Sequence, residues 1–129
     1  MTKREAVIEG SEVHILQSEL TGKTYRLSVA LPYDYHDEPD KKWPVVYHLD
    51  GNTYFGMITE IVRSMAWCGM TRDAIVAGIG YATGTIMREA WHDRLTMRMH
   101  DLTPDRDRER ENRAMEEWNG RLKLRRRPK

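Results

Sequence analysis

The chain has 129 residues, with 21 Lys and Arg against 20 Asp and Glu, and its net charge of +1 implies no polyelectrolyte partner such as nucleic acid. Its hydrophobic content of 40% is enough for a modest core and excludes wholesale disorder and a collagen-like chain. The apolar stretches, such as residues 74–79, fall far short of the roughly 18 residues that a membrane helix needs. Residues 1–5 lack the apolar core of a signal peptide, and the single cysteine, Cys68, cannot form an internal disulfide, so we expect one cytoplasmic domain at most.

A β-hairpin is predicted near the start of the chain. Residues 12–20 and 24–31 are rich in β-branched and aromatic side chains, and the turn signal Thr21-Gly22-Lys23 joins them. Side chains alternate along the second strand, which predicts one buried face and one face that is at least partly wet. The alternating sets are Tyr25, Leu27, Val29 and Leu31 against Arg26, Ser28 and Ala30. Residues 32–43, with two prolines and many charges, are typical of a surface loop.

A strand, a helix and a second strand are predicted next. Residues 45–49 form an uninterrupted apolar run, which is typical of an internal strand. Apolar residues then recur at helical spacing, which predicts a helix with Asn52 or Thr53 as its N-cap and Gly69 at its end. Residues 74–79 read as a second buried strand. The chain is therefore expected to be of the α/β class, with a β-hairpin leading into a mainly parallel sheet with a crossover helix.

Four segments between residues 31 and 104 follow one another in an informative order. They are Leu31-Pro-Tyr-Asp-Tyr35, Trp43-Pro-Val-Val-Tyr-His-Leu-Asp-Gly-Asn-Thr-Tyr-Phe55, Ile75-Val-Ala-Gly-Ile-Gly-Tyr81 and Arg98-Met-His-Asp-Leu-Thr-Pro104. In this order and spacing they resemble the N-terminal part of the putative-esterase family of α/β-hydrolases. The family includes siderophore (enterochelin-type) esterases and S-formylglutathione hydrolases, and the siderophore branch is the most similar. The resemblance covers about residues 7–104.

The resemblance implies a serine nucleophile on a G-x-S-x-G turn, with an acid and a histidine later in the chain, and ester hydrolysis through an acyl-enzyme. This sequence has no such turn, because none of its serines has glycine both two residues before it and two residues after it. The serines are Ser11, Ser18, Ser28 and Ser64. The nucleophile should follow the segment 101–104. We therefore expect the truncated, N-terminal part of a serine carboxylic-ester hydrolase, which is inactive alone.

The loop after residues 45–49 is where the resemblance places one half of an oxyanion hole. In α/β-hydrolases one N–H from this loop and the N–H after the nucleophile bind the developing alkoxide. Gly51 and Asn52 lie in the loop and are the oxyanion-hole candidates. On geometry alone, Asp50-Gly51-Asn52 could equally be a strand-to-helix turn with a good cap. The resemblance implies a small-molecule ester as the substrate of the complete enzyme, and we expect no cofactor.

Two other classes of function stay open. Gly78, Gly80 and Gly84 follow the spacing of a dinucleotide-binding loop, and Asp101 lies 21 residues beyond Gly80, as an oxidoreductase piece would require. This position argues against a dinucleotide-binding loop, because the glycines follow the fourth predicted strand, whereas such a loop follows the first strand of its domain. The chain could also be a non-catalytic binding module or a remnant of an enzyme.

The histidines give weaker signals. His48 in a buried strand could be a ligand or a base, although a hydrogen-bonded core histidine is more common. His92 and His100 stand next to Asp93 and Asp101, but their spacing predicts no metal site.

The C-terminal part of the chain differs in charge from the rest. Residues 104–129 hold ten Lys and Arg against six Asp and Glu, a net of +4, without apolar periodicity. We therefore divide the chain into residues 1–104, the N-terminal portion of an α/β-hydrolase domain, and residues 105–129, a charged tail that is disordered or helical. The strand at residues 74–79 should pair on its outer edge with a strand that the chain does not encode. We accordingly predict self-association through an open sheet edge.

Overall fold

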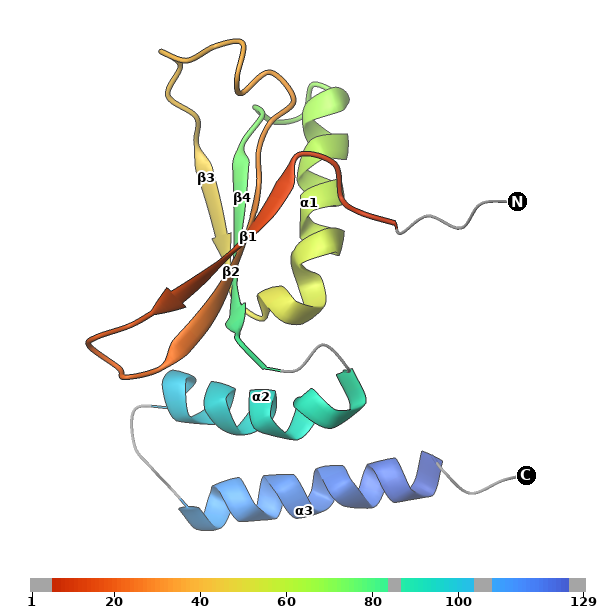
Figure 1. Cartoon of the computed structure of the whole chain (residues 1–129). Helices are drawn as coiled ribbons and strands as arrows, with labels where there is room; N and C mark the ends of the chain where they lie inside the picture. The colour runs from red at the N-terminus through yellow and green to blue at the C-terminus, as the bar shows by residue number, and fades with distance from the viewer. Residues whose placement is uncertain (1–5, 84–86, 104–107, 126–129) are drawn as a thin grey trace, which may run out of the picture. The chain divides into compact units, whose positions relative to one another are not determined.

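The computed structural model of the chain describes residues 6–83, 87–103 and 108–125 (Figure 1). The chain forms two compact units, residues 1–82 and residues 83–129. The first unit contains β1 (Ser11–Gln17), β2 (Thr24–Ala30), β3 (Val45–His48), α1 (Gly51–Trp67) and β4 (Ile75–Tyr81). The second contains α2 (Met87–Leu102) and α3 (Arg108–Arg125). The boundary that we predict near Pro104 lies outside the described residues and stays a prediction.

The predicted hairpin is confirmed. β1 pairs antiparallel with β2, from Ser11 opposite Ala30 to Gln17 opposite Thr24. In the connecting turn, Gly22 has a φ of 66°, a left-handed conformation that glycine adopts without the steric cost of a Cβ. The turn is closed by its own backbone, since the N–H of Gly22 donates to the carbonyl of Ser18 at 2.9 Å.

The four strands form one mixed sheet in the order β1-β2-β4-β3. β4 pairs antiparallel with β2 and parallel with β3, so the predicted parallel strand pair is confirmed. Two predictions about strand position are wrong, because β3 is an edge strand and β4 is internal. The apolar run also predicts that both faces of β3 are covered, but Val45 and Tyr47 on one face are exposed. Such a run carries no information on whether both edges of a strand are paired. In the described part of the first unit, the open edge beside the parallel pair therefore belongs to β3 and not to β4.

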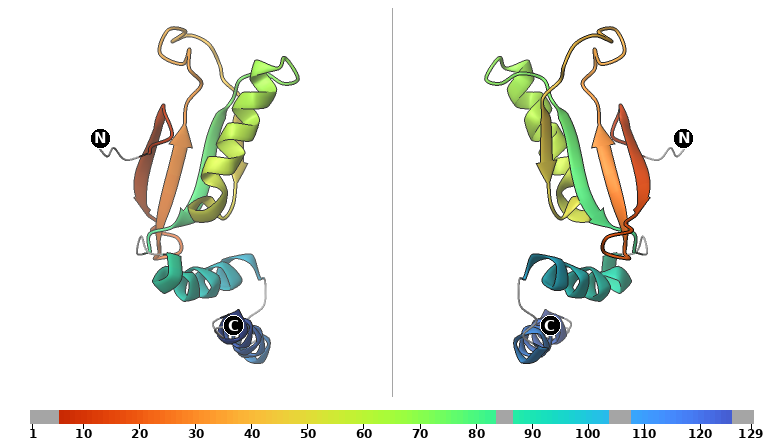
Figure 2. Two further views of the ribbon diagram at one scale, coloured as in Figure 1. Left: turned by 90° about the vertical axis from the view of Figure 1, so that its right-hand side faces the viewer. Right: turned by 90° about the vertical axis from the view of Figure 1, so that its left-hand side faces the viewer.

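α1 covers one face of the sheet, as the two opposite views in Figure 2 show. The core lies between them and contains Ala30, Phe55 and Val76. The buried face of β2 carries Ser28, which is 3% exposed, and Ala30, which is 1% exposed. The alternation of β2 is thus confirmed, and its more buried face is the one with the small side chains. Small side chains allow a helix to approach the sheet closely, which buries them more deeply than larger residues on the other face.

α1 ends where the sequence predicts. Its last residue is Trp67, and Gly69 follows with a φ of 71°. The N–H of Gly69 donates to the carbonyl of Ala66 and the N–H of Met70 to that of Met65, both at 2.9 Å. This pair of bonds is a Schellman motif, which satisfies carbonyls that a helix end otherwise leaves unpaired.

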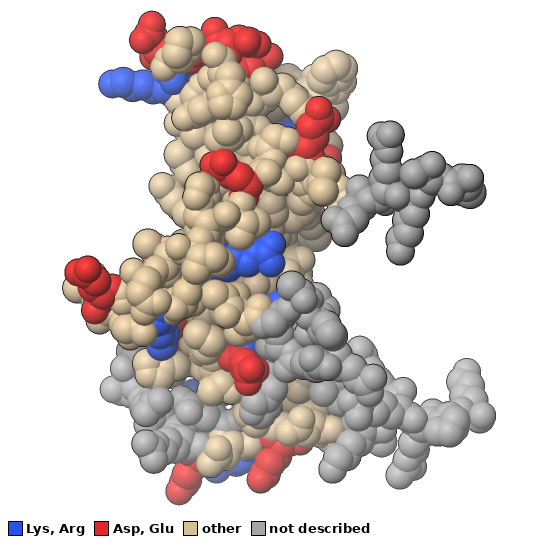
Figure 3. Space-filling view, viewed as in Figure 1, with Lys and Arg blue, Asp and Glu red and all other residues tan. Residues whose placement is uncertain are grey.

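The segment between β2 and β3 is a surface loop, as predicted. Its acidic side chains gather at one end of the first unit (Figure 3). They are Asp34, Asp37, Glu38 and Asp40. The ammonium of Lys41 lies 3.8 Å from the ring centroid of Trp43 and 2.8 Å from a carboxylate oxygen of Glu38. Local contacts of this kind order a loop that has no secondary structure of its own.

The second unit consists of helices in its described residues. In it, the guanidinium Nε of Arg94 donates to the hydroxyl of Thr83 at 2.8 Å. Neither these helices nor α1 is long and apolar enough to span a bilayer, as far as the described residues extend.

Candidate functional site

The turn from β3 into α1 carries both oxyanion-hole candidates. α1 begins at Gly51, and its N-cap is Asp50 rather than the predicted Asn52 or Thr53. The carbonyl of Asp50 accepts hydrogen bonds from the N–H groups of Thr53 and Tyr54 at 2.9 and 3.0 Å. The helix therefore starts before Asn52 and Thr53, the two residues predicted to cap it with their side chains. Asp50 itself is left-handed, with φ 57° and ψ 36°, a conformation that aspartate tolerates better than most residues. The helix therefore begins three residues after the last residue of β3.

Gly51 brings α1 into direct backbone contact with β4. It is buried, and a Cβ at this position would lie 2.6 Å from the carbonyl carbon of Gly78 and 2.7 Å from its oxygen. Real Cβ atoms essentially never come so close to another heavy atom. The close approach that glycine permits here is thus to β4, and it brings the start of α1 against the sheet.

The side chain of Asn52 is used by the fold. Its Oδ1 accepts the N–H of Tyr81 at 2.6 Å, and its Nδ2 donates to the carbonyl of Tyr81 at 3.0 Å. The group that Asn52 can offer to a ligand is therefore its backbone N–H. Among the described residues, the structure gives no acceptor to the N–H groups of Gly51 and Asn52, the first two of α1. Unpaired N–H groups at a helix start favour a negative charge.

The parallel pair places this turn at the carboxyl ends of two strands. β3 ends at His48 and β4 at Tyr81, and α1 starts three residues after His48. In α/β sheets, ligands bind outside the carboxyl ends of the parallel strands. Gly51 and Asn52 therefore lie together at the edge of the sheet where a substrate is expected.

His48 is a half-buried residue at the end of β3. Its Nδ1 lies 2.9 Å from the carbonyl of Leu49, and because a carbonyl only accepts, Nδ1 carries the proton. The ring stacks on Phe55 with centroids 6.3 Å apart, and Nε2 is buried against the position of Gly78. Nδ1 is therefore hydrogen-bonded, whereas Nε2 has no hydrogen-bond partner among the described residues.

The dinucleotide-loop interpretation fails on the geometry of β4. Gly78 and Gly80 lie inside this strand, opposite Ser28 and Arg26 of β2, and not in a loop that could surround a phosphate. Both are needed for packing, because a Cβ on Gly78 would meet the His48 ring at 2.7 Å and one on Gly80 would overlap the Asn52 side chain. Gly84 lies outside the described residues.

The remaining titratable candidates form no site. The Nδ1 atom of His100 lies 3.3 Å from the carboxylate of its neighbour Asp101, and His100 and Asp101 are both exposed. The side chain of His92 is outside the described part of the chain. Where side chains are described, no group of three His, Cys, Asp or Glu residues could hold a metal ion.

Comparison with known proteins assigns the chain to a family. The sequence profile of a family described as "Putative esterase" matches residues 18–114. The chain belongs to this esterase family. It is 33% identical over 100 residues to the ferri-bacillibactin esterase BesA of Bacillus subtilis (strain 168), across 74% of this chain and 34% of that protein. The crystal structure of the BES protein from Bacillus cereus matches with a TM-score of 0.55 and 30% identity, over 65% of this chain and 32% of that one.

The esterase family and the α/β fold class that the four sequence segments predict are therefore confirmed. The chain spans about a third of the length of both relatives. The contacts of Gly51 and Asn52 with β4 are what sequence reasoning missed. The sequence did contain one indication of these contacts, the glycines Gly78 and Gly80, because glycine inside a strand often marks the close approach of another backbone.

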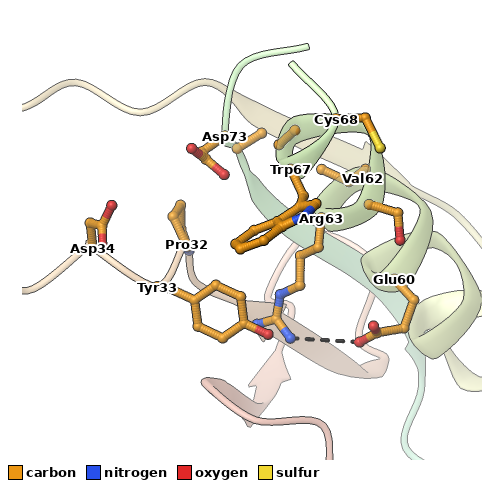
Figure 4. A pocket seen from close by; sticks show the side chains of 12 residues that line it. Pro32, Tyr33, Asp34, Glu60, Val62, Arg63, Trp67, Cys68 and Asp73 are labelled. Atoms are coloured by element: carbon orange, nitrogen blue, oxygen red, sulfur yellow. Dashed lines mark ion pairs between the residues drawn. The ribbon is translucent and has the colours of Figure 1, made fainter. Parts of the chain in front are cut away.

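A groove lies at the other end of α1 in this esterase-family chain (Figure 4). It has a volume of about 700 Å³ and is lined by Tyr33, Arg63 and Trp67, among others. Arg63 donates to the carbonyls of Glu9 and Leu31 at 2.7 and 3.2 Å. α1 has 17 residues, so its two ends are about 24 Å apart and the groove is remote from Gly51.

Proposed function

We propose that this chain supplies the N-terminal part of a serine carboxylic-ester hydrolase of the siderophore-esterase type. Its membership of the esterase family and its 33% identity to a ferri-bacillibactin esterase support the reaction class. The observation that carries the proposal is the pair of N–H groups at the start of α1, on Gly51 and Asn52, at the carboxyl ends of β3 and β4.

The proposed role of Gly51 and Asn52 is to bind the oxyanion. When a nucleophile attacks an ester carbonyl, the carbonyl oxygen gains negative charge, and fixed N–H donors stabilise it more than they stabilise the neutral ester. One such donor contributes about 10²–10³-fold in kcat. The complete enzyme would act on a small-molecule ester, for which an iron-siderophore ester is our proposal, and its cytoplasmic location stays a prediction.

The nucleophile and the general base are proposed to come from outside these 129 residues. None of the four serines lies in a G-x-S-x-G turn. The hydroxyl of Ser11 donates to the carbonyl of Ile8 at 2.7 Å, and that of Ser18 accepts the N–H of Thr21 at 3.2 Å. Ser28 is only 3% exposed. These three environments are structural and provide no activated oxygen, and Ser64 is an exposed residue of α1.

The purified chain is therefore expected to hydrolyse 4-nitrophenyl esters no faster than a heat-denatured sample. Oxyanion donors without a nucleophile and a base leave most of the reaction barrier in place. Intact mass spectrometry after incubation with a fluorophosphonate probe measures this most directly, with the Bacillus subtilis esterase as the positive control. A stoichiometric adduct on any serine of this chain would show that the proposal is wrong.

A further inference from the structure

The side chain of Asn52 makes the same contacts with β4 that another strand would make. β3 ends at His48, which lies opposite Gly78, so the pairing of β3 with β4 does not extend to Tyr81. The amide of Asn52 pairs with both backbone groups of Tyr81, at 2.6 Å to its nitrogen and 3.0 Å to its oxygen. A backbone N–H only donates and a carbonyl only accepts, which fixes the orientation of this amide.

Glycine at position 80 makes room for these bonds. Gly80 is buried, and a Cβ there would overlap Oδ1 of Asn52 and lie 3.0 Å from its backbone nitrogen. On the preceding residue of the helix, a Cβ at Gly51 would lie 2.6 Å from Gly78. The first two residues of α1 are thus in contact with β4 through backbone atoms and through one side-chain amide.

We propose that Asn52 is a positioning residue: its side chain, bonded to Tyr81, fixes the direction of the N–H groups of Gly51 and Asn52. The use of these N–H groups by a substrate rests on the proposed function. Thr53 and Tyr54 direct their N–H groups at Asp50, so the cap orders the second pair of donors. No equivalent bond among the described residues orders the first pair. The Asn52 amide therefore connects the strand that ends at the site with the donors that are proposed to serve it.

Two substitutions separate positioning from general stability. Asn52→Leu removes both bonds at similar volume, and Asn52→Asp keeps an acceptor for the Tyr81 N–H while it can donate only when its carboxyl is protonated, near pH 4. Asn119→Asp, on an exposed position of α3, is the matched control for the same chemical change.

The measurement is the ¹H–¹⁵N spectrum and amide exchange of the full chain. In Asn52→Leu, exchange of the Tyr81 amide is expected to rise about tenfold, and the signals of Gly51 and residue 52 are expected to move. In Asn52→Asp, the Gly51 and Tyr81 signals should differ from wild type at pH 7 and return toward it at pH 4, whereas those of Asn119→Asp should match wild type at both. A residue with only a general structural role would give no such pH-dependent return.

Unchanged Gly51 signals in Asn52→Leu, or no pH response in Asn52→Asp, would overturn the positioning role. If Asn52→Leu does not fold, the Asn52→Asp titration alone decides, because that variant keeps one of the two bonds. The spectra test the positioning role separately from the proposed function. If the Gly51 and Tyr81 signals change as expected but the oxyanion site proves inactive, the positioning role stands and only the esterase role is removed.

Discussion

Gly51→Ala is expected to destabilise the first unit by about 3 kcal/mol, the upper part of the usual range for overpacking. The new Cβ would meet the carbonyl carbon and oxygen of Gly78 at 2.6 and 2.7 Å. Both contacts are with the backbone of an internal strand, which cannot rotate away as a side chain can. Thermal unfolding followed by circular dichroism should show a fall of about 15 °C in Tm.

Gly56→Ala is the matched control in the same helix. Its Cβ would meet only the tip of the Ile8 side chain, at 3.2 Å, and that side chain can adjust. Alanine is favoured over glycine in a helix interior by up to about 1 kcal/mol, so Tm should stay constant or rise. If Gly51→Ala melted at the same temperature as Gly56→Ala, the start of α1 would not be in contact with β4.

Self-association of the wild-type chain is expected to proceed through β3. This strand has one unpaired edge in the described residues, and Tyr47 in its middle is 70% exposed. Tyr47→Lys should therefore abolish association without loss of the fold, because a lysine on an edge strand opposes pairing with another chain. Sedimentation velocity at several concentrations should show a sedimentation coefficient that rises with concentration for wild type and stays constant for the variant.

Leu20→Lys provides the control for this prediction. Leu20 is 99% exposed in the hairpin turn, so the substitution removes a similar apolar surface far from the β3 edge. It should associate as wild type does. A wild-type chain that sediments as a monomer at all concentrations would contradict the open-edge prediction, and equal effects of the two lysines would show that pairing through β3 is not the cause.

Local pattern was sufficient for the elements of the first unit. The alternation in residues 24–31 and the turn at Gly22 predict the hairpin, because both depend on neighbouring residues. The end of α1 at Gly69 is equally local, since a left-handed residue after a helix is usually glycine. These features require no knowledge of which strands are neighbours.

Strand order and the surroundings of the candidate site were beyond such patterns. The edge position of β3 depends on pairing between residues that are 30 apart, such as Val45 and Ile75. Asn52 and Tyr81 are 29 residues apart, and nothing in the sequence near either one indicates their hydrogen bonds. Gly78 and Gly80 were visible in the sequence, but glycine in a strand is compatible both with a phosphate loop nearby and with a helix packed against it.

The central claim is that the segment from β3 to α1 carries one half of an oxyanion hole. It is tested by replacing the aligned segment of the Bacillus subtilis esterase with residues 44–70 of this chain and measuring ester hydrolysis. We predict that the chimera keeps kcat within about tenfold of the parent, because the donors are backbone groups. In the chimera, Asn52→Pro removes one N–H and should lower kcat by about 100-fold more than Asn52→Ala does. A folded chimera without hydrolysis, or equal activity of the proline and alanine variants, would contradict the claim and favour a non-catalytic binding module.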